Sequence, residues 1–186
     1  MDWDTYFLNI ACETAKKTKC MSRAIGAVLV ARGKFVVGTG FNGPAIGVKP
    51  CLDMTVWRER FAESGLPNML VNRAVLTECP RRLLAYKSGE GLHMCPAAHS
   101  ERNAIDIAAR MGVPTEGCYL YLTCGVPCLE CAKTIIQAGI TEIVVTRLKV
   151  YESAPITGLQ MLREGDVRVR LYHCDAEAIL KEKGIS

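Results

Sequence analysis

The sequence predicts an α/β domain of three layers, in which helices cover both faces of one sheet. Two observations carry this prediction. In the second half of the chain, short β-branched runs alternate with segments of helical periodicity, which is typical of α/β proteins. Near the start, a helical segment precedes two β-branched runs around Arg32 and Gly33, the pattern of a hairpin. A length of 186 residues fits one domain.

The individual elements follow from side-chain periodicity and from the residues at their ends. Trp3, Phe7 and Ile10 stand at helical spacing, and Gly112 and Gly139 are expected to stop two later helices. We expect helices over residues 3–17, 99–111, 127–138 and 175–183, and strands over residues 25–30, 34–39, 118–123, 142–146 and 167–172.

Residues 45–98 differ from the rest of the chain because Gly and Pro recur throughout them. Short helical pieces over residues 54–63 and 69–77 fit this stretch. We interpret residues 1–186 as a single domain that carries an insertion at about 45–98, rather than as two domains.

Composition and charge exclude several classes of protein. Hydrophobic residues make up 49% of the chain and charged residues 23%, which argues against disordered, collagen-like and coiled-coil proteins. The net charge of +4 suits a small anionic ligand or an ordinary solvated surface, but it lacks the basic clustering of a nucleic-acid binder. The start, MDWDTYF, is unlike a secretory signal, and no apolar run is long enough to span a membrane. We expect a cytoplasmic protein that binds neither membranes nor nucleic-acid polymers.

Cysteine is unusually frequent, at 10 of 186 residues, yet this stays below the roughly 8–10% of a small disulfide scaffold. Thiols stay reduced inside cells. The cysteines are therefore expected to be metal ligands, catalytic groups or small buried hydrophobes.

The strongest motif combines HSE at residues 99–101 with PCLEC at residues 127–131. This H-x-E…P-C-x-x-C combination is the signature of zinc nucleobase deaminases. Pro127 suits the first turn of a helix, where Cys128 and Cys131 share one face near the positive helix end, which favours thiolates. With His99 at another helix start, three ligands would leave a fourth tetrahedral position for water.

Glu101 adds a proton carrier to this predicted zinc site. A carboxylate near a zinc-bound water can accept its proton and deliver it to a ring nitrogen and to leaving ammonia. The expected reaction is hydrolytic deamination of an amidine-like ring carbon. Taken alone, a C-x-x-C pair is equally typical of a redox pair or a structural zinc half-site, and a single His is typical of a helix cap. The combination in a strand–helix context favours the catalytic interpretation.

From about Cys20 to Tyr151 the chain resembles the deoxycytidylate (dCMP) deaminases of the cytidine deaminase-like superfamily. The resemblance rests on four stretches: CMSRAIGAVLV, GTGFNGP, HSERNAI and LYLTCGVPCLECAKTIIQAGI. It implies a cytidine deaminase-like α/β/α fold with a mixed sheet of about five strands. Two residues depart from the family pattern. Ser100 replaces the usual Ala, where we expect little effect, and Val126 replaces the usual Ser or Glu, which bears on base preference.

The resemblance implies roles for individual residues. His99, Cys128 and Cys131 would hold a catalytic zinc, and Glu101 would move protons. Asn42 would bind the deoxyribose, with a purely structural turn residue as the alternative. The 5′-phosphate would be bound by Ser22, Arg23 and Tyr151. The alternative for Arg23 is a solvated position on the surface, and the alternative for Tyr151 is packing.

A second, structural zinc is also expected, because the insertion has little core of its own and metal binding would supply folding free energy. The family resemblance implies that the ligands of this second zinc are Cys20, Cys51, Cys79 and Cys95, with His93 as a competing ligand. The alternative is four unrelated thiols. The remaining cysteines are expected in the core: Cys12, Cys118, Cys124 and Cys174.

The family resemblance further implies regulation and assembly. Members form oligomers, commonly hexamers, in which dCTP with magnesium activates and dTTP inhibits. Gly43 and Arg110 would lie at the effector site, although an arginine at a helix end is typically just solvated.

We therefore expect a zinc enzyme that converts dCMP into dUMP and ammonia for dTMP synthesis. One alternative is a deaminase of CMP, dCTP or a 5-modified dCMP. Another is a non-catalytic zinc-stabilised module that binds nucleotides.

Overall fold

The computed structural model describes residues 1–51, 53, 78–87, 90–148 and 156–172. Their contacts divide the chain into two compact units. The first consists of Met1–Thr18, Ala24–Asn42 and the chain from His99 onward, and the second of Lys19–Arg23 and Gly43–Ala98. The interpretation of residues 45–98 as an insertion into one domain stays a prediction.

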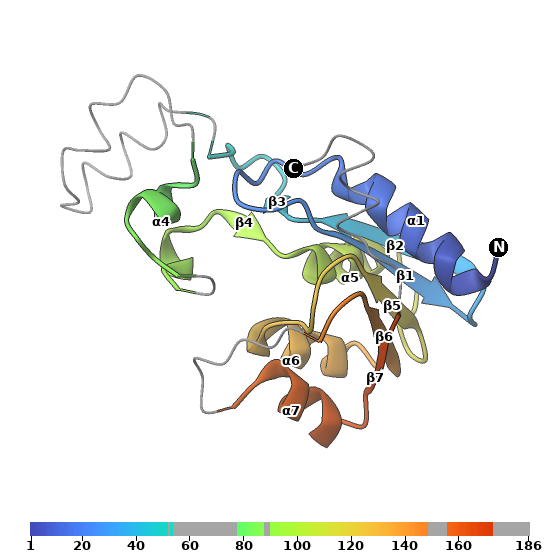
Figure 1. Ribbon diagram of the computed structural model, residues 1–186. Coiled ribbons are helices and arrows are strands. Elements are labelled where there is room, and N and C mark those ends of the chain that lie inside the picture. Colours follow the sequence, from blue (N-terminus) through green and yellow to red (C-terminus); the bar gives the residue numbers. More distant parts are fainter. Residues whose placement is uncertain (52, 54–77, 88–89, 149–155, 173–186) are drawn as a thin grey trace. The chain divides into compact units, whose positions relative to one another are not determined.

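A mixed five-stranded sheet forms the centre of the first unit, in the order β2-β1-β5-β6-β7 (Figure 1). The hairpin strands β1 and β2 pair antiparallel, as do β1 and β5, whereas β5, β6 and β7 run parallel. The strands are β1 (Gly26–Ala31), β2 (Phe35–Phe41), β5 (Tyr119–Leu122), β6 (Glu142–Val145) and β7 (Arg168–Leu171).

Helices cover both faces of this sheet. On one face, α1 (Trp3–Ala15) buries Phe7, Leu8 and Ala11 against alternate residues of β1, β5 and β6. The other face packs against α5 (Ser100–Arg110), α6 (Leu129–Gln137) and α7 (Gly158–Glu164). The predicted three-layer α/β fold with a mixed sheet of about five strands is confirmed.

Helix boundaries agree with the sequence to within two residues wherever a helix was expected and is described. Gly112 and Gly139 have φ angles of +67° and +69°, the left-handed conformation that ends α5 and α6. The expected helix over residues 175–183 lies outside the described residues. Helix α7 was not expected, although Thr157 and Gln160 form a capping box at its start.

Two glycines let α5 approach β2 closely. A Cβ atom at Gly40 would overlap the carbonyl oxygen of Ser100, and one at Gly38 would meet the carbonyl oxygen of Ala104. Strand backbone and helix backbone therefore touch directly, which fixes the first turn of α5 against the sheet.

The second unit contains only short elements among its described residues. Strand β3 (Gly43–Pro44) pairs antiparallel with β4 (Ala97–Ala98), and α4 (Pro80–Leu83) and a 3₁₀ turn (Leu92–Met94) lie between them in sequence. The helical pieces expected over residues 54–63 and 69–77 lie outside the described residues. Within the described part of the chain, no helix is long and apolar enough to cross a membrane.

Candidate active site

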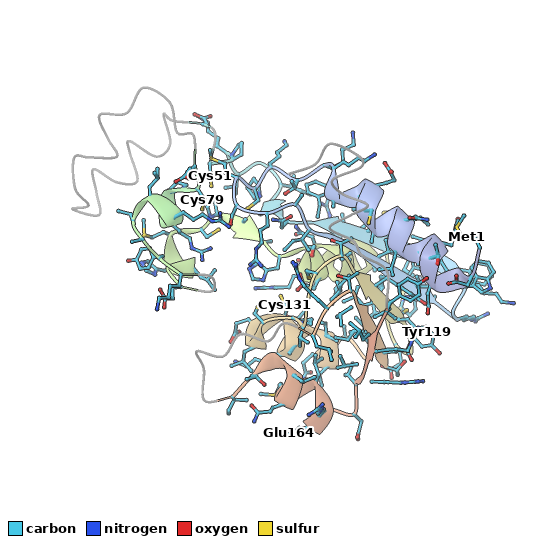
Figure 2. All side chains as sticks on the ribbon, in the orientation of Figure 1. Met1, Cys51, Cys79, Tyr119, Cys131 and Glu164 are labelled. Carbon is cyan, nitrogen blue, oxygen red and sulfur yellow. The ribbon has the colours of Figure 1, made fainter. Side chains whose placement is uncertain are left out.

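Three side chains from two helix starts converge in the first unit. His99 is the N-cap of α5 and Cys128 is the N-cap of α6. Cys131, labelled in Figure 2, lies in the first turn of α6. Nδ1 of His99 lies 3.3 Å from Sγ of Cys131 and 3.4 Å from Sγ of Cys128. One ligand atom from each residue falls within 4.8 Å of the others. The three residues named from the motif thus stand together.

The charge state of the two thiols fits a metal site. Hydrogen bonds from Cys131 and His99 lower the pKa of the Cys128 thiol to about 4. The pKa of the Cys131 thiol is raised, first because it donates to Cys128 and then because it is buried. The lowered pKa of Cys128 favours its thiolate, the form that binds a metal ion.

The donor set suits zinc. One imidazole nitrogen and two thiolate sulfurs are ligands that zinc prefers, and three protein ligands are the number found in catalytic zinc sites. Cys131 is fully buried, whereas His99 and Cys128 are partly exposed, so the cluster opens toward solvent on one side.

Glu101 lies beside this cluster, one residue into α5 after Ser100. Its side chain is 5% exposed, and its charge contributes to the raised pKa of Cys131, which places the carboxylate near that sulfur. The fully buried Ser100 donates a hydrogen bond from Oγ to Oε2 of Glu101 at 2.9 Å. Ser100, expected from sequence to matter little, thus contacts the predicted proton carrier.

Asn42 is buried directly after β2, and its amide oxygen accepts two hydrogen bonds. Oδ1 accepts hydrogen bonds from Oγ1 of Thr18 at 2.9 Å and from the backbone N–H of Ile25 at 2.8 Å. The following residue, Gly43, pairs with Ala98, the residue before His99. Asn42 and His99 therefore occupy neighbouring positions along the two chain segments.

Asn103 supports the start of α5 and is not among the residues predicted from the sequence. Its Nδ2 donates to the carbonyl oxygen of Phe41 at 2.7 Å, which ties the first turn of α5 to the residue before Asn42. The motif HSERNAI contains this asparagine, so the signal was present in the sequence.

The predicted phosphate and effector residues belong to different parts of the chain. Ser22 and Arg23 belong to the second unit, where the carbonyl oxygen of Ser22 accepts a hydrogen bond from Arg82 at 3.4 Å. Arg110 is exposed in the last turn of α5, and Gly43 is buried in β3. Tyr151 lies outside the described residues. Their roles stay predictions.

The five candidate ligands of a second zinc all belong to the second unit, and two of them, Cys51 and Cys79, are buried (Figure 2). Among the described residues, His99, Cys128 and Cys131 form the one group of three potential ligands within 4.8 Å of each other. The predicted second set, which is Cys20, Cys51, Cys79, Cys95 and His93, stays a prediction. His93 packs edge-on against Tyr86.

The core cysteines are confirmed where they are described. Cys12, Cys118 and Cys124 are buried in hydrophobic clusters, and burial raises the pKa of the Cys118 thiol. Cys174 lies outside the described residues.

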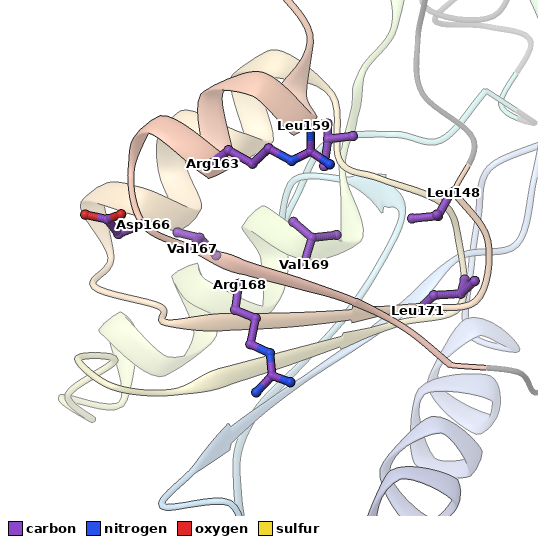
Figure 3. Close-up of a pocket in the computed structure, with 8 residues that line it drawn as sticks. All are labelled: Leu148, Leu159, Arg163, Asp166, Val167, Arg168, Val169 and Leu171. Carbon is purple, nitrogen blue, oxygen red and sulfur yellow. The ribbon is translucent and has the colours of Figure 1, made fainter.

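A hollow of about 430 Å³ lies elsewhere in the first unit, against α7 and the edge strand β7 (Figure 3). Leu159 and Arg163 of α7 face Val169 and Leu171 of β7 across it. None of the site residues described above lines this hollow.

The mixed sheet and the cluster of one histidine and two cysteines beside a glutamate are the fold and the ligand set of the cytidine deaminase-like zinc proteins. The family model of the cytidine and deoxycytidylate deaminase zinc-binding region matches residues 1–147. The chain belongs to this family.

Named relatives agree with this assignment. The chain is 36% identical over 142 residues to the deoxycytidylate deaminase of Schizosaccharomyces pombe, a match covering 76% of this chain but only 36% of that protein. It is 32% identical over 162 residues to the deoxycytidylate deaminase of Mus musculus, covering 87% of this chain and 74% of that one.

Solved structures agree with the fold. The dCMP deaminase of cyanophage S-TIM5, in complex with dCMP and dUMP, superposes with a TM-score of 0.60 at 20% identity. The superposition covers 90% of this chain and 95% of the phage chain.

Proposed function

We propose that this protein is a zinc-dependent deaminase that hydrolyses dCMP to dUMP and ammonia. The observation that carries the proposal is the convergence of His99, Cys128 and Cys131 beside the buried Glu101. Several relatives of the same family bear the name deoxycytidylate deaminase, which supports dCMP as the substrate.

The reaction replaces the amino group at C4 of the base by an oxygen. The oxygen of water forms a bond to C4, the bond from C4 to the amino nitrogen breaks, and the water's two protons end on ring N3 and on the leaving ammonia. A bound zinc ion would supply a water whose pKa is lowered to about 7. His99, Cys128 and Cys131 would hold that ion.

Glu101 is the group that moves the protons in this proposal. It takes one proton from water and delivers it to N3, and then carries the second proton to the departing amino nitrogen. Its burial beside the ligand cluster supports this role, because bulk water has little access to compete for the proton.

Asn42 would contact the deoxyribose as a hydrogen-bond donor. The hydrogen bonds that its Oδ1 accepts from Thr18 and Ile25 would hold the side chain in place for that contact. Ser22, Arg23 and Tyr151 would meet the 5′-phosphate, for which a guanidinium is well suited.

A second zinc would stabilise the second unit, whose described elements span two to four residues each. Cys20, Cys51, Cys79 and Cys95 would bind it, with His93 as an alternative ligand. Metal analysis tests this point: two zinc ions per chain are expected, falling to one in Cys79→Ser. A wild-type content of one zinc would contradict it.

Regulation by dCTP with magnesium and by dTTP, through Gly43 and Arg110, belongs to the same proposal, as do a hexameric assembly and a cytoplasmic role in supplying dTMP precursors. Adding each effector to the assay and measuring the sedimentation of the protein test these points. Unchanged rates with both nucleotides would contradict the regulatory part.

The deciding experiment is ammonia release from a panel of dCMP, CMP, dCTP, 5-methyl-dCMP and deoxycytidine with zinc-loaded protein. We expect dCMP to give the highest kcat/KM and deoxycytidine to be poor because it lacks the phosphate. A higher kcat/KM on another nucleotide reassigns the substrate. Zinc-loaded protein that releases no ammonia from any of them contradicts the enzymatic proposal and leaves a zinc-stabilised binding module.

A further inference from the structure

We infer that Ser100 is a positioning residue that holds the carboxylate of Glu101 for proton transfer. The inference rests on the proposed deaminase function, in which Glu101 moves the protons. Oγ of Ser100 donates to Oε2 of Glu101 at 2.9 Å, and both side chains are buried.

The hydrogen bond gives the two carboxylate oxygens different tasks. A serine hydroxyl has a single hydrogen, and in this structure it points to Oε2. Oε2 is thereby held in place, and Oε1 becomes the oxygen that accepts the proton of water and delivers it to the base. A single proton-carrying oxygen with a fixed partner needs less reorientation between the two transfers.

The backbone of Ser100 is itself anchored to the sheet. Its carbonyl oxygen lies so close to Gly40 that a side chain at Gly40 would overlap it. Gly40 in turn pairs with Ala27 in the central hairpin. One turn further along α5, Asn103 donates to the carbonyl oxygen of Phe41. These contacts connect the sheet to the first turn of α5, and Ser100 extends that support to the Glu101 carboxylate.

The contact is also unusual for a helix. Consecutive residues on a helix point in different directions and do not normally face one another. A serine at a helix start usually bonds a nearby backbone group, yet here its hydroxyl points to the next side chain. The N-cap His99 makes no side-chain capping bond either, which leaves the first turn of α5 arranged for the site rather than for helix capping.

The first test compares wild type, Ser100→Ala and Ser100→Thr by kcat, KM for dCMP and zinc content. Because acid–base transfer contributes about 10²–10⁴-fold, we expect Ser100→Ala to lower kcat by about tenfold. KM and zinc content should stay unchanged, and Ser100→Thr, which keeps the hydroxyl, should recover most of the loss. Equal kcat in wild type and Ser100→Ala would overturn the role of Ser100 alone. A wild type inactive on every nucleotide would overturn both proposals.

The second test does not depend on turnover. The 5′-phosphorylated deoxyriboside of 2-pyrimidinone, which adds water reversibly at C4 and has no amino group to lose, serves as the probe. Ser100→Ala should weaken its binding by about tenfold when Glu101 is present and have no effect in a Glu101→Ala background. An equal loss in both backgrounds would show that Ser100 acts only through packing.

Discussion

Arg170 in β7 binds the carboxylate of Asp4 in α1 through both of its terminal nitrogens, one of them at 2.9 Å from Oδ1. The same guanidinium donates from Nε to Glu142 in β6 at 3.0 Å, and Tyr121 of β5 donates to Asp4 at 2.9 Å. Residues 166 positions apart thus attach the first helix to the edge of the sheet. Asp4 and Arg170 are 23% and 29% exposed, so water screens this network only in part.

Asp4→Asn should destabilise the protein because it removes the negative charge that Arg170 binds. Hydrogen bonds to charged groups contribute about 1.5–3 kcal/mol each, and the partial exposure reduces the expected loss to about 1–2 kcal/mol. Urea unfolding of the zinc-loaded protein measures it. Glu13→Gln, which removes an exposed ion pair with Lys16 on the same helix, is the matched control and should leave the midpoint unchanged. Equal midpoints for Asp4→Asn and the control would contradict the prediction.

The contribution of Asp4 to stability should also depend on pH. The hydrogen bonds from Arg170 are the main reason that the pKa of Asp4 lies below its ordinary value of 3.8. The unfolded chain therefore takes up this proton before the folded chain does, so the stabilisation is complete above that value and is lost as the pH falls through the lowered pKa. The stability difference between wild type and Asp4→Asn should shrink on acidification. Protonation of the zinc ligands at low pH destabilises both proteins equally and so leaves this difference unchanged. A stability difference that grows toward low pH would contradict the prediction.

The sequence predicted the parts of this structure that depend on short-range patterns. The motifs around His99 and Cys128 identify ligands because each motif occupies a single helix start, where spacing fixes geometry. The strand order was not predictable in this way, because β1 pairs with both the adjacent β2 and the distant β5. The pairing of Asp4 with Arg170 depends on that order. The contact between Ser100 and Glu101 was not predicted for a different reason. Side chains of consecutive residues in a helix normally point in different directions, so no contact between them is expected.

Glu101→Gln should abolish turnover while zinc stays bound. The amide has nearly the same shape and can still accept the hydrogen bond of Ser100, but it cannot take a proton. The expected loss in kcat is about 10²–10⁴-fold. Ammonia release and zinc content of the same sample measure the two properties. Asp106→Asn, an exposed charge-to-amide change on the same helix, serves as the control and should retain full activity. Near-normal turnover in Glu101→Gln would remove the glutamate from the mechanism.

Thr18→Val should weaken substrate binding, because it removes a hydroxyl that donates to the backbone carbonyl oxygen of Asn42 at 2.6 Å and to its amide Oδ1 at 2.9 Å. The side-chain volume is kept. A net hydrogen-bond contribution of about 0.5–1.5 kcal/mol corresponds to a rise in KM of about two- to tenfold. Thr18→Ser keeps the hydroxyl and should restore KM. Steady-state kinetics with dCMP should be compared for Thr18→Val, for Asn42→Ala and for the double variant. The comparison checks whether Thr18 acts through Asn42. If the effect of Thr18→Val persists in the Asn42→Ala background, Thr18 does not act through the side chain of Asn42.

Gly40→Ala and Gly38→Ala form a matched pair that separates packing from function. Each added methyl group would meet a carbonyl oxygen of α5, Ser100 in the first case and Ala104 in the second. Both should therefore destabilise the protein, since overpacking of a rigid contact costs typically about 1–3 kcal/mol. Only Gly40→Ala displaces the turn that holds His99 and Glu101, so it should also lower zinc affinity and kcat, whereas Gly38→Ala should keep both once it is folded. Zinc titration against a competing chelator, at a temperature where both variants are folded, distinguishes the two. Equal zinc affinities would mean that the first turn of α5 moves independently of its contact with β2.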